Sequence, residues 1–288
     1  MKVLIYNNKE KDFSGEILLK LITELDKNEI KYEILEDNNL EESVSADVLF
    51  AIGGDGTILY LSEFCNKNSI PLIGINAGRL GFLCEFEKNE IENAVVLLKS
   101  GRLVEDNCLM MKVQYKGKEY YALNDVFVQR TYNQSTYKES VGNMATDLRI
   151  EINDMQVLKM KGDGAIISTP TGSTAYSLSL GGPIIYPGSN SFVLSTIAAH
   201  SFNQRPIVYN SESYCRVFVD GKANVGAFVD GEMIGLLKEN DYIEIQKADK
   251  PLIFLRKKNY DFMKRLSNKL GNSFGGNWWV EKQDLMKY

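Results

Sequence analysis

The sequence predicts an α/β domain with a parallel, Rossmann-like sheet, followed by a β-rich, sandwich-like domain and a last helix that returns to the first domain. Three observations carry this prediction. Apolar runs of strand length alternate with helical patterns over residues 1–100, which is typical of a parallel sheet with right-handed crossovers. Short strand-like runs separated by turn signals follow from about residue 105. A glycine-rich loop directly follows one of the early apolar runs.

The first hundred residues combine strand-like runs with helical patterns. The strand-like runs cover residues 3–6, 32–35, 48–52 and 72–75. Apolar residues recur at helical spacing through Ile17, Leu21 and Leu25, and again through Ile91, Val95 and Leu98. A further helix is expected to begin near Thr57, directly after the glycine-rich loop. Because ligands of such sheets bind beyond the carboxyl ends of the strands, this loop lies where we expect a site.

The second part of the chain is predicted to form short strands. They cover residues 123–128, 148–152, 157–160, 165–168, 217–219, 227–229 and 243–245. Turn signals such as Asn153-Asp154 and Asp220-Gly221 separate them, which favours antiparallel sheets. Residues 260–270 show a helical pattern that we expect Gly271 to close.

These patterns divide the chain. We expect an α/β domain over residues 1–100, with residues 255–272 packing back on it, and a β-rich domain over residues 101–254. Residues 273–288 form a polar tail apart from Trp278 and Trp279.

Composition narrows the class of protein. The net charge of −5 gives no electrostatic reason to expect nucleic acid or an anionic membrane as a partner. The four cysteines are scattered without CxxC spacing and His200 is the single histidine, so we expect reduced thiols and no Cys/His metal site. The apolar run at the N-terminus is too short for a signal peptide, and no stretch approaches the ~18 apolar residues that span a membrane. A cytoplasmic location is the expectation.

The glycine-rich loop, residues 53–57, is the most informative stretch. Its glycines let the backbone turn sharply and bring N–H groups close to an anion, and the helix N-terminus behind them suits a phosphate. Asp55 places a carboxylate inside this phosphate cradle. Such a carboxylate is explained by chemistry: it orients or deprotonates an attacking hydroxyl, or helps to hold a metal.

Four further clusters carry polar chemistry. Residues 169–179 contain seven hydroxyl side chains, enough to donate many neutral hydrogen bonds to a ligand or to cap a helix and loop. Asn124-Asp125 can read a base edge or a ribose, although such a pair is often only a turn. Residues 76–82 combine glycines with Arg79, which could pair with a phosphate. Asp230-Gly231-Glu232 fits a hairpin turn as well as a functional site.

Taken together and in this order, the clusters closely resemble the NAD kinase family. The family pattern has a GGDGT loop, an NxGxLGF segment, an Asn-Glu pair, a DG-x₅-TPTGSTAYSLSxGGP run and a later SVDGQ-like turn. This chain has residues 53–57, 76–82, 124–125, 163–183 and 228–232 at those places, and residues 200–208 resemble the family's PHxxxxRPIV stretch. The resemblance covers roughly residues 1–270.

The resemblance implies a reaction and a set of site residues. The implied activity is transfer of the γ-phosphoryl of ATP, with Mg²⁺, to the 2′-hydroxyl of the adenosine ribose of NAD⁺. Asp55 matches the proposed catalytic base. The substrate-binding positions carried over are Gly53, Gly54, Gly56, Thr57, Arg79, Phe82, Asn124, Asp125, Lys161, Asp163, Thr174, Ala175, Tyr176, Ser177, Leu178, Ser179, Asp230 and Glu232. Family members are commonly homodimers or homotetramers with shared sites, so an oligomer is also implied.

Two departures from the family pattern and several rival functions remain. Asp125 stands where the family has Glu, one methylene longer, and Glu232 where it has Gln. A lipid kinase of the diacylglycerol or sphingosine type shares the GGDGT loop but leaves residues 169–179 without a role. Also open are a non-enzymatic dinucleotide-binding regulator, a 6-phosphofructokinase-like enzyme, and a hydrolase built on His200, although no Gly-x-Ser-x-Gly elbow occurs.

Overall fold

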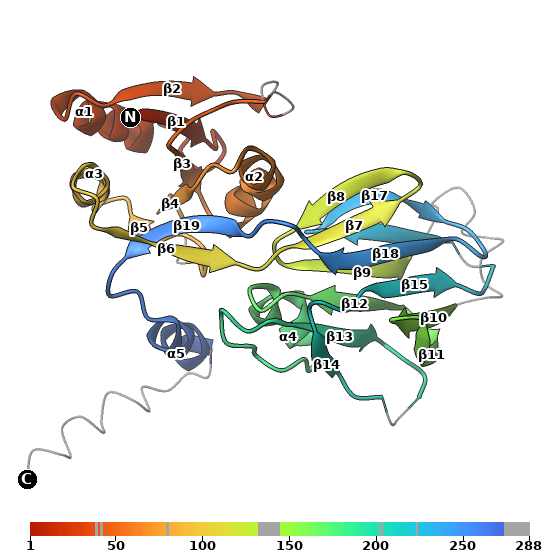
Figure 1. Cartoon of the computed structure of the whole chain (residues 1–288). Coiled ribbons are helices and arrows are strands. Elements are labelled where there is room, and N and C mark those ends of the chain that lie inside the picture. Colours follow the sequence, from red (N-terminus) through yellow and green to blue (C-terminus); the bar gives the residue numbers. More distant parts are fainter. Residues whose placement is uncertain are drawn as a thin grey trace, which may run out of the picture.

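The computed structural model describes residues 1–37, 40, 43–78, 81–131, 145–201, 204–222 and 224–273. It contains an α/β part with a mostly parallel sheet, followed by a β-rich part. Figure 1 shows the α/β part on the left and the two sheets of the β-rich part on the right.

The first sheet has the strand order β2-β1-β3-β4-β19-β6, with β5 beside β4. Its strands are β1 (Lys2–Asn7), β2 (Lys31–Leu35), β3 (Val48–Gly53), β4 (Leu72–Asn76), β5 (Phe86–Glu87), β6 (Leu103–Cys108) and β19 (Leu252–Lys257). All neighbours pair in parallel except β19 and β6, which are antiparallel. The sheet therefore includes β6, which lies within the range 101–254 that the sequence assigned to the second domain, and β19, which straddles its end.

Helices cover both faces of this sheet. They are α1 (Glu16–Lys27), α2 (Asp55–Asn68) and α3 (Ile91–Lys99). One apolar core joins Val3, Ile5 and Phe50 to α1 and α3, and the other joins Leu4 and Leu49 to α2. The strands are apolar on both sides because both faces are buried, as expected for a parallel sheet.

The β-rich part consists of two antiparallel six-stranded sheets, with strand orders β11-β10-β15-β18-β7-β8 and β14-β13-β12-β9-β16-β17. The bounds are β7 (Met111–Tyr115), β8 (Lys118–Ala122), β9 (Asp125–Arg130), β10 (Thr146–Ile152), β11 (Met155–Gly162), β12 (Gly164–Ser168), β13 (Ser191–Ile197), β14 (Ile207–Asn210), β15 (Cys215–Val219), β16 (Val225–Val229), β17 (Glu232–Leu237) and β18 (Tyr242–Lys247). One core joins residues of both sheets, such as Val217 and Ile245 with Val126 and Ile167. Apolar residues alternate with others along these strands because each sheet turns one face inward.

Two short helical elements follow β12, and a longer helix ends the described part of the chain. They are a 3₁₀ turn (Gly172–Thr174), α4 (Tyr176–Ser179) and α5 (Phe262–Ser273). The expectation that Gly271 closes the last helix is wrong, because α5 continues through it to Ser273. Gly271 does not adopt the positive φ that ends many helices.

Candidate active site

The glycine-rich loop lies at the carboxyl end of β3, where the chain enters α2. A Cβ at Gly53 would lie 2.2 Å from Thr57 Oγ1, and that oxygen accepts a hydrogen bond of 2.9 Å from Asn8 Nδ2. Gly53 and Thr57 are thus packed into the protein. A Cβ at Gly54 or Gly56 would meet no atom within 4 Å. The open side of the turn therefore exposes backbone beside a helix N-terminus, which suits an anionic group.

Asp55 is the first residue of α2 and its carboxylate is held by the segment after β4. The backbone N–H of Phe82 donates to Asp55 Oδ2 at 2.8 Å, and that of Leu83 donates to Oδ1 at 3.0 Å. A Cβ at Gly81 would lie 1.8 Å from Oδ1, so only glycine permits this approach. Each carboxylate oxygen keeps a further acceptor site for a ligand hydroxyl. The expected Arg79 lies outside the described residues.

Asp230 acts as an anchor for the backbone around Asn124. Its carboxylate accepts hydrogen bonds from the N–H groups of Leu123 (2.7 Å), Asn124 (2.8 Å) and Asp125 (3.0 Å). Asp230 has a positive φ of 46° and is followed by Gly231 at 90°, which builds the tight turn into β17. With three donors on its oxygens, Asp230 shapes the site through the backbone.

Asp125 and Asp230 are both buried, and the pKa of each carboxyl is raised. Burial first, and the charge of Asp230 second, raise the pKa of Asp125 to about 7. Burial also raises the pKa of Asp230, to about 6, although its three N–H donors oppose the shift. Because those donors favour the anion of Asp230, Asp125 is the group that holds a proton near neutral pH.

An aromatic row extends the site along the outer face of the sheet that contains β9. The Phe127 ring stacks on Phe228, with centroids 4.6 Å apart, and meets Tyr176 edge-on at 5.6 Å. Burial, then the charges of Asp125 and Asp163, raise the pKa of Tyr176. Asp125 and Asp163 therefore both act on Tyr176, although they stand at opposite ends of the paired strands β9 and β12.

Asp163 lies between β11 and β12, and its carboxylate forms an ion pair with Arg130 at the end of β9. The Arg130 Nε lies 2.9 Å from Asp163 Oδ1. A Cβ at Gly164 would lie 2.2 Å from the Val128 carbonyl oxygen, which explains one of the flanking glycines. Lys161 points elsewhere, with its Nζ 3.9 Å from Asp147 on β10.

Several hydroxyls of residues 169–179 hold the loop itself. Thr169 Oγ1 donates to the Leu123 carbonyl at 2.5 Å, Ser173 Oγ donates to the Pro170 carbonyl at 2.6 Å, and Thr174 Oγ1 donates to the Thr171 carbonyl at 3.2 Å. A Cβ at Gly172 would lie 2.0 Å from the Asn124 carbonyl oxygen. Three hydroxyls of the run therefore hold the loop and the neighbouring backbone in place, and their oxygens keep lone pairs that can accept from a ligand.

The rest of this run forms α4 and the turn before it. Ala175 precedes the helix, and Tyr176, Ser177, Leu178 and Ser179 make it up. Ser177 is fully buried, and its Oγ has no hydrogen-bond partner within the described part of the chain.

A cavity of about 820 Å³ lies between the two parts of the chain. Gly56 and Tyr60 line it from α2, and Asp230 and Glu232 line it from the β16–β17 turn. Burial, then the charge of Asp37 and its hydrogen bond, and last the charge of Glu232 raise the pKa of Tyr60. The fold thus brings the glycine-rich loop to the turn that anchors residues 123–125.

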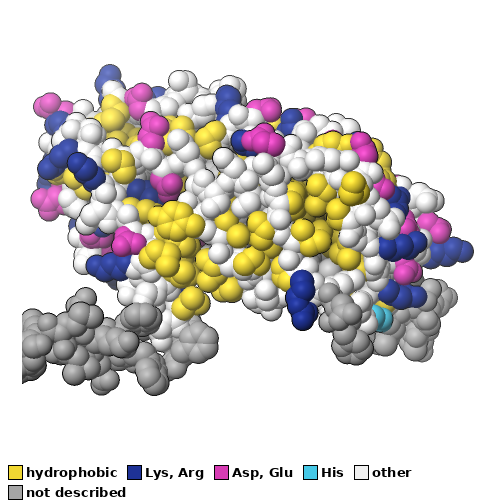
Figure 2. All heavy atoms as spheres, turned by 60° about the horizontal axis from the view of Figure 1, so that its bottom comes forward, with side chains coloured by type: hydrophobic (Ala, Val, Ile, Leu, Met, Phe, Trp, Pro, Cys, Tyr) yellow, Lys and Arg dark blue, Asp and Glu magenta, His cyan; other side chains and the backbone are white. Residues whose placement is uncertain are grey.

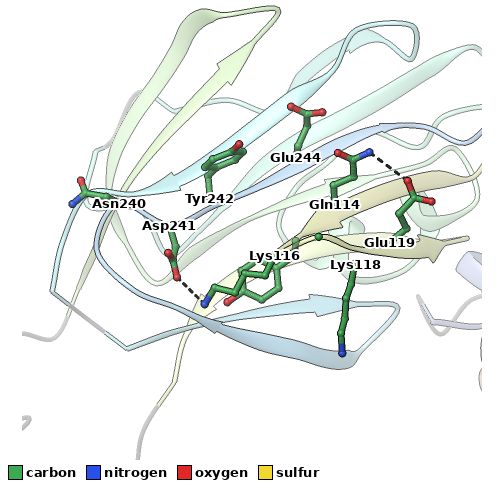
Figure 3. Close-up of a pocket in the computed structure, with 10 residues that line it drawn as sticks. Gln114, Lys116, Lys118, Glu119, Asn240, Asp241, Tyr242 and Glu244 are labelled. Carbon is green, nitrogen blue, oxygen red and sulfur yellow. Dashed lines mark hydrogen bonds and ion pairs between the residues drawn. The ribbon is translucent and has the colours of Figure 1, made fainter.

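A second cavity, of about 480 Å³, contains none of the predicted site residues. It lies between the β7–β8 hairpin and the β17–β18 turn (Figure 3). Within this lining, Lys116 pairs with Asp241 at 3.1 Å, and the Gln114 amide donates to Glu119.

Comparison with known sequences shows which family this chain belongs to. Residues 7–102 match the ATP-NAD kinase N-terminal domain, and residues 132–257 match the ATP-NAD kinase C-terminal domain. The chain belongs to the ATP-NAD kinase family. An NAD kinase of Caldicellulosiruptor bescii is 33% identical over 272 residues, covering 94% of this chain and 99% of that protein. An NAD kinase of Clostridium tetani is 36% identical over 275 residues, covering 91% and 96%.

Solved structures share the fold. Yeast NADH kinase complexed with NADH superposes with a TM-score of 0.82 at 24% identity, covering 94% of this chain and 87% of that chain. An NAD kinase from Archaeoglobus fulgidus in complex with ATP gives 0.73 at 24% identity, covering 94% and 98%. Membership of the ATP-NAD kinase family decides against a lipid kinase.

Sequence reasoning missed three cations of this ATP-NAD kinase site. Arg130 pairs with Asp163, and Arg265 and Lys269 of α5 contact the segment around Asp55. Isolated basic residues, whether at the end of β9 or on the polar helix α5, carry no signal that separates them from a solvated surface. Among the described helices, none combines the length and apolar character needed to cross a bilayer.

Proposed function

We propose that this protein transfers the γ-phosphoryl group of ATP to the 2′-hydroxyl of the adenosine ribose of NAD⁺, giving NADP⁺. Membership of the ATP-NAD kinase family supports the reaction. The observation that carries the mechanism is the Asp55 carboxylate, fixed by two backbone N–H groups beside an open phosphate-binding turn.

Phosphoryl transfer depends mostly on in-line positioning and on neutralising charge. In the proposed mechanism the N–H groups around Gly54 and Gly56 hold phosphate oxygens. Asp55 orients the 2′-hydroxyl and accepts its proton late, as the bond to phosphorus forms. Asn124, Asp125 and Tyr176 bind the dinucleotide, together with the other predicted positions from 163 to 179.

Mg²⁺ is proposed to enter with ATP. The described residues hold no group of three or more Asp, Glu, His or Cys side chains that could form a resident metal site. Mg²⁺ retains several waters and commonly binds through substrate phosphates, so this donor set fits a nucleotide-borne ion. The ion would neutralise phosphate charge.

The last helix is proposed to belong with the first domain, as its contacts with residues 82–85 suggest. Strand pairing favours an α/β domain that gains β6 and β19, in place of a division at residues 100 and 254. A cytoplasmic location remains a proposal.

A homodimer or homotetramer is also proposed. Figure 2 shows apolar side chains gathered over the face that carries β13, β14 and α5. Exposed apolar residues on or beside these elements include Tyr186, Val208 and Met263. Light scattering of the purified protein would test the oligomer, and a monomer at assay concentrations would refute it.

The activity is tested with NAD⁺, Mg²⁺ and a panel of phosphoryl donors, following NADP⁺. Asp55→Asn keeps the shape of the side chain and removes the base, so we expect a loss of kcat on the order of 10²–10⁴-fold with NAD⁺ affinity retained. Absence of NADP⁺ with every donor would refute the reaction, and near-normal turnover by Asp55→Asn would refute the role of Asp55.

A further inference from the structure

Helix α5 directs two cations at the carboxylate proposed as the base. Arg265 and Lys269 are four residues apart and therefore share one face of the helix. Lys269 Nζ lies 3.9 Å from Asp55 Oδ2 and 4.0 Å from the centre of the Phe82 ring. The Lys269 side chain is 26% exposed, unlike an ordinary surface lysine. Burial lowers its pKa, and the charge of Asp55 opposes that shift.

Arg265 reaches Asp55 through one peptide group. Its Nη1 donates to the carbonyl oxygens of Phe82 (3.1 Å) and Cys84 (2.6 Å), and its Nη2 donates to Glu85 at 3.2 Å. The Phe82 carbonyl and the Leu83 N–H belong to the same peptide unit, and that N–H donates to Asp55 Oδ1. A cation on the carbonyl side polarises the peptide and strengthens its N–H as a donor.

We propose that Lys269 and Arg265 are positioning residues that fix the Asp55 carboxylate for phosphoryl transfer. Lys269 acts directly on Oδ2, and Arg265 acts on Oδ1 through the Phe82–Leu83 peptide. Both oxygens of the carboxylate are then held, by the backbone N–H groups of residues 82–83 and by the cations of α5. This inference rests on the role proposed above for Asp55.

The experiment uses the full chain and compares kcat, both KM values and the thermal midpoint. Lys269→Met keeps most of the stem and removes the charge. We expect kcat to fall about tenfold or more, with KM for NAD⁺ and ATP within about twofold, because orientation is lost and binding groups are untouched. Lys269→Arg should recover most of kcat. Lys264→Met, an exposed lysine on the same helix, is the matched control and should match wild type.

Arg265→Lys supplies a second variant, because it keeps the charge and loses the fork that reaches two carbonyls. We expect the same pattern: a lower kcat with unchanged KM values.

Three results would overturn the inference. They are a wild-type kcat in Lys269→Met, an ATP KM raised about tenfold with kcat unchanged, or a fall in kcat that follows the thermal midpoint and is not rescued by Lys269→Arg. The second would make Lys269 a donor-binding group and the third a structural one. Failure of the reaction itself is distinct, since wild type would then form no NADP⁺.

Discussion

Replacing Gly81 by alanine should lower the catalytic rate, because the added Cβ must push the Asp55 carboxylate and the 81–83 backbone apart. The added Cβ would stand 1.8 Å from Asp55 Oδ1 and 2.4 Å from its carboxyl carbon. Real Cβ contacts are essentially never below 3.0 Å, so the carboxylate and the 81–83 backbone must separate by about 1.2 Å. The N–H groups of Phe82 and Leu83 move with that backbone, so their hydrogen bonds to the Asp55 carboxylate are weakened or broken.

A misplacement of about 1 Å can cost roughly 10²-fold in rate. We therefore expect Gly81→Ala to lower kcat about 100-fold, equivalent to about 2.7 kcal/mol of transition-state stabilisation. NADP⁺ formation under saturating NAD⁺ and ATP measures this directly. KM for NAD⁺ should change little, because residues 124–125 and 174–179 lie on other segments.

Gly101→Ala is the control for stability. Gly101 has φ of +62° in an exposed turn after α3, with no atom within 4 Å of an added Cβ. Alanine there should cost roughly 1 kcal/mol of folding stability and leave kcat unchanged. A Gly81→Ala enzyme with near-wild-type kcat would refute the argument that Gly81 exists to admit the Asp55 carboxylate.

The remaining predictions concern the dinucleotide side of the site. Because the folded-state pKa of Asp125 (about 7) is raised above an unfolded value near 4, its contribution to stability is greatest at low pH and is lost as pH rises through about 7. Asp125→Asn should therefore raise the thermal midpoint at pH 8 relative to wild type and flatten the change between pH 5 and 8; an unchanged profile would contradict the shift. Gly172→Ala places a Cβ 2.0 Å from the Asn124 carbonyl oxygen and should raise KM for NAD⁺ about tenfold or more, with a smaller effect on kcat; equal effects on both would place the loop in the chemical step instead.

Local signals predicted the parts of the fold that local sequence determines. The runs at 48–52 and 72–75 are β3 and β4 because strands buried on both faces are apolar throughout. The glycine-rich loop was placed correctly after β3, since it needs only its neighbours to form.

Long-range pairing was not predictable in the same way. The strand β19 joins β4 at a sequence distance of about 180 residues, as in the pair Phe254–Leu72, and no local pattern names its partner. Likewise, no local pattern predicts that the oxygens of Asp230 accept three backbone N–H groups from residues 123–125. The strand β7 was missed although Met111, Val113 and Tyr115 alternate with polar residues, because five residues give only a short alternating pattern.

The place of β19 also constrains how the chain is made. Translation delivers residues 1–108 long before residues 252–257, so β4 and β6 leave the ribosome without the strand that pairs between them. Until then the nascent α/β half presents open strand edges, a template for unwanted pairing. A ribosome-bound chain that ends before residue 252 should therefore require chaperone protection, and only the synthesis of residues 252–257 completes the half of the enzyme that was made first.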